Sequence, residues 1–266
     1  MTAAPDRRAL IEALDWQIEL GADEAIGEAP INRFDRAAAA DPRPAPPPDP
    51  VRGAPPVVAG APAPGDAGAG AAAGSAAAVA SAAMTLADLQ AAVAGFDGCE
   101  LKRGARNTVF ADGQAGARVM IVGEAPGADE DRLGKPFVGR AGQLLDAMFR
   151  AIGLARDDGS LYIANILPWR PPGNRTPDQG EIDLMMPFVR RHVDLAQPDV
   201  LIPMGNVSCL GLLGRQGITR IRGNWTRALD RPALPMFHPA YLLRSPAAKR
   251  EAWADLLALK AWLRDN

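Results

Sequence analysis

Three polar residues stand at the ends of apolar runs that are typical of buried strands. Glu124 follows VMIVG, Asn165 ends LYIAN, and His238 follows LPMF. Strands that alternate with helices form a parallel sheet, and ligands bind such sheets beyond the carboxyl ends of the strands. A carboxylate, an amide and an imidazole at this edge could position water, recognise a ligand and stabilise a developing negative charge. Each also has a structural interpretation, as a helix cap, a buried hydrogen-bonded amide or a core histidine.

The loop after the first predicted strand is rich in glycine and acidic residues. It reads GEAPGADEDRLGKPFVGRAGQLL over residues 123–145. Its glycines allow the backbone to approach a ligand closely, although neither the P-loop nor the Rossmann spacing occurs. Glu130 belongs to an acidic cluster that could cap a helix, and Phe137 could be a core residue or a stacking platform. The loop is therefore a candidate binding element of no standard nucleotide-binding type.

Predicted helices separate the strands along the chain. Helices are expected over 141–152, after Thr176, after the strand at 200–204, and from Ser245–Pro246 to the C-terminus. For the second of these helices, Thr176 is expected as the N-cap, Pro177 as the first residue and Gln179 as the capping-box partner. With a fourth strand over 234–237, this alternation predicts an α/β fold with a parallel sheet covered on both faces.

Composition divides the chain near Met84. The sequence has 27 Gly and 25 Pro, and many of the prolines lie between residues 42 and 64, ahead of an Ala/Gly/Ser tract. We therefore expect a short N-terminal helical segment over 1–35, a disordered linker over 36–83 and a folded domain over 84–266. Residues 1–83 carry 6 basic and 11 acidic side chains, net −5; the remaining 23 and 20 give the domain net +3, which permits nucleic-acid binding.

Several classes of protein are excluded by composition. Two cysteines cannot form a disulfide framework or an all-cysteine metal site. The N-terminus has no apolar segment typical of a secretory signal, and the run over 67–83 is too weakly apolar for a membrane span. We expect a cytoplasmic protein with no membrane partner.

Four sequence blocks together resemble the uracil-DNA glycosylase superfamily, and its family 4 most closely. They are GEAPGADED, KPFVGRAGQLL, NILPWRPPGNRTP and FHPAYLL. The resemblance implies a three-layer α/β/α sandwich around a four-stranded parallel sheet. It also implies a monofunctional base-excision repair enzyme that hydrolyses the N-glycosidic bond of uracil in DNA and leaves an abasic site. The implied partner is uracil-containing DNA, bound by a monomer.

The resemblance assigns roles to the residues of these blocks. The implied substrate-binding residues are Gly123, Ala125, Gly127, Phe137, Asn165 and Asn174. The amide of Asn165 can accept from uracil N3–H and donate to O4, a pattern that cytosine reverses. The candidate catalytic residues are His238, which would support uracil O2, and Glu124 and Glu130, which would position water or brace the loop. Asn174 and Arg175 are expected to pair with Glu124.

An enzyme that acts on a base must first flip the nucleotide out of the duplex. The basic candidates for phosphate contacts are Lys135, Arg140, Arg175 and Arg244. Tyr241, Leu242 and Leu243 precede Arg244 and could enter the base stack as a wedge. A core position for Leu242 or Leu243 is equally compatible with the sequence.

The sequence departs from family 4 at the residues that hold its four-iron cluster. Of the four ligand positions, Cys99 alone is cysteine, and the others are Lys102, Trp169 and Met185. One thiolate cannot hold such a cluster. We therefore expect no iron–sulfur centre and no metal, with Trp169 and Met185 packed as apolar side chains in its place.

Two other functions remain open from the sequence. One is a module that binds uracil or abasic sites in DNA without cleavage, which loss of the cluster would suit. The other is a nucleotide or flavin binder on a similar sheet, which would leave the HPAYLLR segment unexplained.

Overall fold

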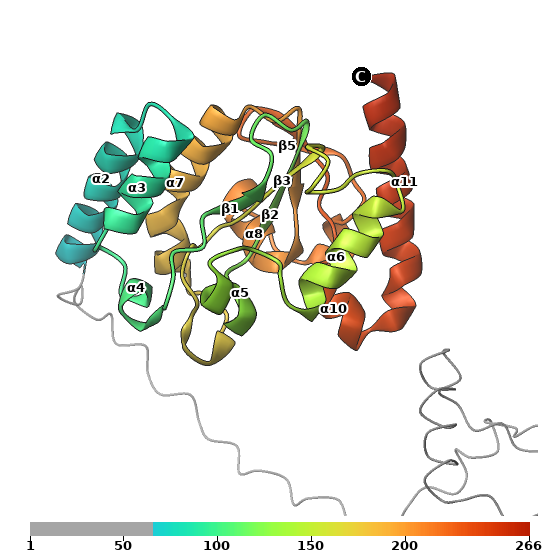
Figure 1. Ribbon diagram of the computed structural model, residues 1–266. Helices are drawn as coiled ribbons and strands as arrows, with labels where there is room; N and C mark the ends of the chain where they lie inside the picture. Colours follow the sequence, from blue (N-terminus) through green and yellow to red (C-terminus); the bar gives the residue numbers. More distant parts are fainter. Residues whose placement is uncertain (1–65) are drawn as a thin grey trace, which may run out of the picture. The chain divides into compact units, whose positions relative to one another are not determined.

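The computed structural model describes residues 66–266 (Figure 1). The predicted N-terminal helical segment over 1–35 and residues 36–65 of the predicted linker lie outside the described residues. Residues 66–82, expected as the end of that linker, form helix α2 (Asp66–Ala82) instead. Ala76 and Ala80 of α2 are buried in the main hydrophobic cluster. The prediction was wrong here because small side chains bury little surface each, yet allow a helix to lie close to its neighbours.

The sheet contains six strands in the order β1-β3-β2-β4-β6-β5. Its four central strands, β3, β2, β4 and β6, are parallel to one another. The edge strands β1 and β5 are antiparallel to their neighbours. The strands are β1 (Ala111–Gly113), β2 (Val119–Gly123), β3 (Leu161–Asn165), β4 (Val200–Pro203), β5 (Thr226–Ala228) and β6 (Arg231–Ala233).

The expected four-stranded parallel sheet is therefore only the centre of a larger mixed sheet. The two edge strands are three residues long and carry no run of apolar residues, so no strand pattern marks them in the sequence. The fourth parallel strand also begins earlier than the predicted 234–237. Its parallel pairing extends from Ala233 to Met236, which bridges to Met204.

Helices cover both faces of the sheet (Figure 1). Alternate residues of β2 point to opposite faces, as strand geometry requires. Met120 and Val122 join the cluster beneath α2, α3 and α7. Val119 and Ile121 join the cluster beneath α6 and α11. The described helices are α2, α3 (Leu86–Gly95), α4 (Leu101–Gly104), α5 (Ala128–Leu133), α6 (Arg140–Arg150), α7 (Gln179–Ala196), α8 (Gly205–Leu213), α9 (Ile218–Ile221), α10 (Pro239–Arg244) and α11 (Lys249–Asp265), with 3₁₀ turns at Pro172–Asn174 and Pro246–Ala248.

The N-cap of helix α7 lies two residues after the predicted one, and the capping-box partner is Glu181 instead of Gln179. Asp178 is the N-cap, and its side chain accepts a hydrogen bond from the backbone N–H of Glu181. The Glu181 carboxylate accepts from the backbone N–H of Asp178 in return, which completes a capping box. Thr176 and Pro177 were wrong as cap and first residue because Asp–x–x–Glu satisfies the same free N–H groups. None of the described helices is long and apolar enough to cross a membrane.

Candidate active site

A cavity of about 580 Å³ lies at the carboxyl ends of the parallel strands. Its lining brings together most of the residues that the sequence indicated: Glu124, Ala125, Gly127, Glu130, Phe137, Asn165, Asn174, Arg175, His238, Tyr241 and Arg244. The strand register explains why the residues after β2 and at the end of β3 lie close together, because Gly123 at the end of β2 pairs directly with Asn165 at the end of β3. Gly123 itself lies behind the lining.

Asn165 lines this cavity, and its side chain carries an unpaired acceptor. Its side-chain oxygen is buried and has no hydrogen-bond partner, and no other buried side-chain nitrogen or oxygen of residues 74–266 is in this state. Buried acceptors in folded proteins are almost always paired. The side chain also makes no other hydrogen bond within the described part of the protein, so its structural interpretation loses support. The arrangement is suited to a ligand that brings an N–H donor.

Gly123 provides the space that Asn165 and Phe137 occupy. A Cβ atom at this position would lie 2.6 Å from the Phe137 ring and would also overlap the Asn165 side-chain oxygen. No such contact is sterically acceptable, so glycine is required for the amide and the ring to lie side by side. Gly123 therefore shapes the site without lining it.

His238 is a neutral hydrogen-bond donor. It is the N-cap of α10, and its Nδ1 accepts from the backbone N–H of Ala240 at 3.2 Å. Burial, reinforced by the positive charge of Arg244, lowers the pKa of His238 to about 4. The neutral ring carries one proton, and because Nδ1 is the acceptor, Nε2 holds it. Such a donor can stabilise an oxygen on which negative charge develops.

Glu124 contributes an isolated carboxylate to the cavity. Burial raises its pKa above the ordinary value. The expected pairing with Asn174 and Arg175 is absent from the described structure. Arg175 instead donates to both carboxylate oxygens of Glu181, at 2.5 and 2.9 Å, and the Asn174 oxygen accepts from Arg170 at 2.7 Å. Glu124 is left facing the cavity, where it can accept a hydrogen bond from water.

Glu130 joins the two ends of the loop. One carboxylate oxygen accepts from the backbone N–H groups of Val138 and Gly139, both at 2.9 Å. The other oxygen accepts from the N–H of Gly127 at 3.1 Å. With both oxygens engaged by backbone, Glu130 is placed to brace the loop, which is the second of the two roles that the sequence suggested for it.

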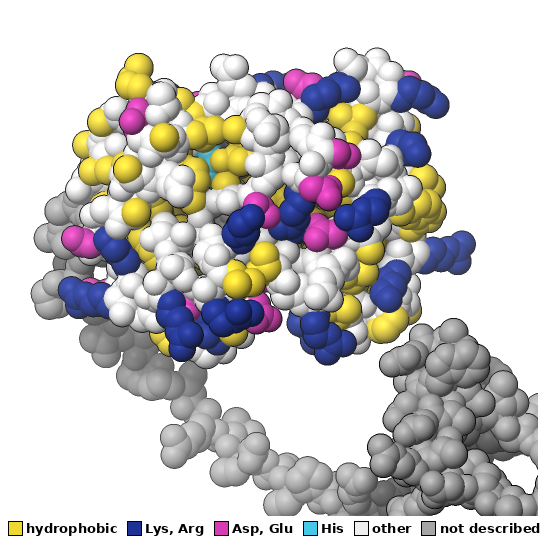
Figure 2. Space-filling model, in the orientation of Figure 1, with side chains coloured by type: hydrophobic (Ala, Val, Ile, Leu, Met, Phe, Trp, Pro, Cys, Tyr) yellow, Lys and Arg dark blue, Asp and Glu magenta, His cyan; other side chains and the backbone are white. Residues whose placement is uncertain are grey.

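The candidate DNA-contacting residues fall into two groups: Arg175, Tyr241 and Arg244 line the cavity, and Lys135, Arg140 and Leu242 do not. Figure 2 shows Lys and Arg side chains along the lower edge of the molecule, over the region of α4, α5 and α10. Lys135 is 62% exposed and pairs with Asp112 at 3.2 Å, and Arg140 is exposed at the start of α6. Leu242 is only 1% exposed, whereas Leu243 is 39% exposed. Of the two leucines, Leu243 is the one available as a wedge.

Sequence reasoning missed the contribution of α8 to the cavity. Gly205, Asn206 and Val207 line the cavity, together with Ile218 of α9. Gly205 has a φ of 88° and packs on His238, to which an added Cβ would approach within 3.2 Å. The available signal was a Gly-Asn pair directly after the third strand, the position at which the other strands carry Glu124, Asn165 and His238.

Three of the four positions that hold a cluster in family 4 form part of the hydrophobic core. Cys99, Trp169 and Met185 are 3%, 1% and 1% exposed and belong to one cluster. The Trp169 indole donates to the Thr108 hydroxyl at 3.1 Å, and Lys102 pairs with Asp97. The packing predicted for Trp169 and Met185 is confirmed. These residues do not fit a cluster that requires four thiolates. Within the described residues, no group of three or more His, Cys, Asp or Glu is arranged to hold a metal ion.

Comparison with known proteins decides the family. The sequence-family model of the Uracil DNA glycosylase superfamily matches residues 110–257, more than half of the chain. The chain belongs to the uracil DNA glycosylase superfamily. It is 36% identical over 171 residues to a Type-4 uracil-DNA glycosylase of Thermotoga maritima, which covers 62% of this chain and 88% of the relative. The Type-4 uracil-DNA glycosylase of Pyrobaculum aerophilum is 35% identical over 182 residues, 65% of this chain and 92% of the relative. A Type-5 uracil-DNA glycosylase of the same organism is 28% identical over 146 residues, which cover 49% of this chain and 64% of the relative.

The family membership agrees with the blocks identified in the sequence. The matched region runs from just before β1 into α11 and contains every element that lines the cavity. It begins after α2, α3 and α4, which lie outside the region that the family model matches.

Proposed function

We propose that the protein is a monofunctional uracil-DNA glycosylase, which hydrolyses the N-glycosidic bond of uracil in DNA and leaves an abasic site. The observation that carries this proposal is the unpaired, buried oxygen of Asn165 at the cavity. Uracil N3–H supplies the donor that this oxygen lacks, and uracil O4 accepts from the amide nitrogen. Cytosine would place an acceptor against the oxygen and a donor against the nitrogen, so the same amide rejects it.

In the proposed reaction the flipped uracil enters the cavity and stacks on Phe137. As the glycosidic bond lengthens, electrons pass to the uracil ring and negative charge develops on O2. The Nε2–H of neutral His238 donates to that oxygen. The carboxylate of Glu124 orients a water molecule and opposes the positive charge on the sugar. Water adds to the sugar carbon as uracil departs as an anion with the electrons of the glycosidic bond, and the proton that the water loses passes to the Glu124 carboxylate. Glu130 keeps the loop in place.

DNA is proposed to lie across the basic rim of the cavity. Arg244, Arg175, Lys135 and Arg140 would contact phosphates, which position the strand without reading its sequence. Leu243, with Tyr241, is the candidate wedge, since Leu242 is buried. We propose that the protein acts as a monomer in the cytoplasm; sedimentation of the protein alone and with DNA tests the first of these points.

The proposed enzyme works without an iron–sulfur cluster. The support is the packed Trp169 and Met185 at two ligand positions and Lys102 at a third. Purified protein should therefore contain no stoichiometric iron or acid-labile sulfide, and its activity should be unchanged by a chelator.

The test of function is release of uracil from an oligonucleotide that contains one uracil, followed by alkaline cleavage at the abasic site. Wild-type protein should give the cleaved product and free uracil. Asn165→Ala should form both products much more slowly than the wild type. Binding of uracil-containing or abasic DNA without any product would replace the glycosylase by a non-catalytic binding module.

A further inference from the structure

Phe137 holds a backbone conformation that residues other than glycine rarely adopt. Its φ is 53°, in the left-handed region, which crowds a Cβ atom. Such a conformation persists only where surrounding groups enforce it, and it is concentrated at functional sites. The ring itself forms part of the cavity wall and stacks on the imidazole of His238, with 5.3 Å between the ring centroids.

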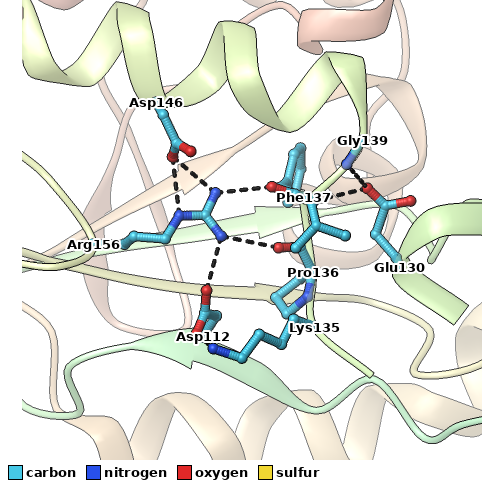
Figure 3. Close-up of polar contacts among 9 residues, drawn as sticks. Asp112, Glu130, Lys135, Pro136, Phe137, Gly139, Asp146 and Arg156 are labelled. Atoms are coloured by element: carbon cyan, nitrogen blue, oxygen red, sulfur yellow. Dashed lines mark hydrogen bonds and ion pairs between the residues drawn. The ribbon is translucent and has the colours of Figure 1, made fainter. Parts of the chain in front are cut away.

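Arg156 holds the backbone on both sides of this strained residue, through the carbonyls of Pro136 and Phe137. Its guanidinium donates to the carbonyl oxygen of Phe137 at 2.9 Å and to that of Pro136 at 3.1 Å (Figure 3). Two carboxylates fix the guanidinium in turn, Asp112 at 2.9 Å and Asp146 at 2.8 Å. All three nitrogens of the group thus contact acceptors, and only the planar guanidinium offers five donors in this geometry.

The C-terminal side of Phe137 is fixed by further groups as well. The N–H groups of Val138 and Gly139 donate to Glu130, as described above (Figure 3). Gly142 of α6 packs so closely on the Phe137 carbonyl that a Cβ atom would overlap it. The peptide group that carries the Phe137 carbonyl therefore has little freedom to rotate. Arg156 donates a hydrogen bond to the carbonyl oxygen in this fixed orientation.

We propose that Arg156 is a positioning residue for the glycosylase reaction, which sets the Phe137 ring in place to receive the flipped base. The inference rests on the proposed function, because it assigns the ring to stacking on uracil. Arg156 does not line the cavity and its side chain is 16% exposed. It therefore acts through the backbone of Phe137 and not by contact with the substrate.

A double-mutant cycle on uracil excision tests this role. Arg156→Lys keeps the charge but cannot bridge two carbonyls and two carboxylates at once. Misplacement of a substrate-positioning group by about 1 Å can cost about 100-fold, so we expect kcat/KM to fall about 10- to 100-fold. In a Phe137→Ala background, where no ring remains to be positioned, the same substitution should cost less than about 3-fold. An equal loss in both backgrounds would overturn the proposal.

The matched control is Arg191→Lys. Arg191 also holds a backbone carbonyl, that of Ala83, through two nitrogens at 2.9 and 2.7 Å, and it does not line the cavity. Its replacement should leave kcat/KM unchanged. If Arg156→Lys does not fold, Asp146→Asn removes one anchor of the guanidinium and should give a smaller loss that also disappears in the Phe137→Ala background.

Crystal structures separate this inference from the proposed function. In the wild-type protein Phe137 should keep its left-handed φ, and in Arg156→Lys or Asp146→Asn it should leave that region with its ring displaced. An unchanged φ and ring in the variants would overturn the role of Arg156 even if the enzyme is active. A wild-type protein that releases no uracil would instead refute the glycosylase, while the crystallographic comparison would still decide what Arg156 does.

Discussion

Replacing Asn165 by alanine should separate activity from stability. The Asn165 side chain makes no hydrogen bond to the described part of the protein, and its buried oxygen has no partner. Truncation therefore breaks no bond of the folded state, and the free energy of unfolding should change by less than about 1 kcal/mol. A structural asparagine with paired groups would behave in the opposite way.

The expected loss of activity follows from the two groups of uracil that the amide would satisfy. Without the amide, N3–H and O4 enter the cavity unpaired, and each buried unpaired polar group costs about 1–3 kcal/mol. The sum of about 2–6 kcal/mol corresponds to a decrease in kcat/KM of about 30-fold to 10⁴-fold. The loss should appear with uracil in single-stranded DNA as well as in duplex, since the contacts are to the base.

The assay is single-turnover excision of uracil by Asn165→Ala and by the control Asn224→Ala, with urea unfolding of both. Asn224 is exposed and does not line the cavity, and its side chain donates only one long hydrogen bond, of 3.3 Å, to the Arg220 carbonyl. Full activity of Asn165→Ala would refute base recognition by this amide. A loss of stability of several kcal/mol with unchanged activity of the folded fraction would make the residue structural.

Four further predictions concern titration and DNA contacts. Burial raises the pKa of Glu124 above its ordinary value of 4.5, and the proposed reaction uses the ionised carboxylate. As the pH falls, kcat should therefore begin to decrease already above pH 4.5. Glu124→Gln should lower kcat and abolish this acid limb of the pH–rate profile. His238→Asn removes the donor to O2 and should lower kcat about 10²- to 10³-fold with little change in DNA binding measured by fluorescence anisotropy; an unchanged kcat would refute the donor. The pKa of His192 is lowered by burial to about 3 and that of His238 to about 4, so the unfolded chain takes up protons below pH 6.5 that the folded chain does not. Each histidine should thus cost about 2 kcal/mol of stability between pH 7 and pH 5, and His192→Asn should halve this loss in urea titrations. Arg244→Ala should reduce the slope of log K for DNA against log salt concentration by about 1; an unchanged slope would place Arg244 away from phosphate.

The sequence by itself determined the central sheet and most of the site. The runs VMIVG and LYIAN are short and largely apolar, and a polar residue follows the first (Glu124) and ends the second (Asn165), a pattern that suits strands buried on both faces. Because parallel strands end at one edge, Glu124, Asn165 and His238 had to meet there. The lack of cysteine at three of the four cluster positions was equally readable, since it depends only on which residue types occupy them.

Only the tertiary structure decided features that depend on what each segment packs against. The Ala/Gly-rich residues of α2 carry no amphipathic signal and become a helix because the domain supplies a surface for Ala76 and Ala80. The sequence could not distinguish the adjacent residues Leu242 and Leu243. In the structure Leu242 is buried and Leu243 is exposed, because successive residues of a helix point to different sides.

The support of Phe137 shows the same limit most clearly. Arg156 lies 19 residues beyond Phe137 in the chain and its carboxylate partners, Asp112 and Asp146, come from an edge strand and a helix. No local pattern connects such residues, because their association depends on the path of the folded backbone. Sequence fixes which groups end each strand, whereas the three-dimensional packing fixes which distant groups hold them in place.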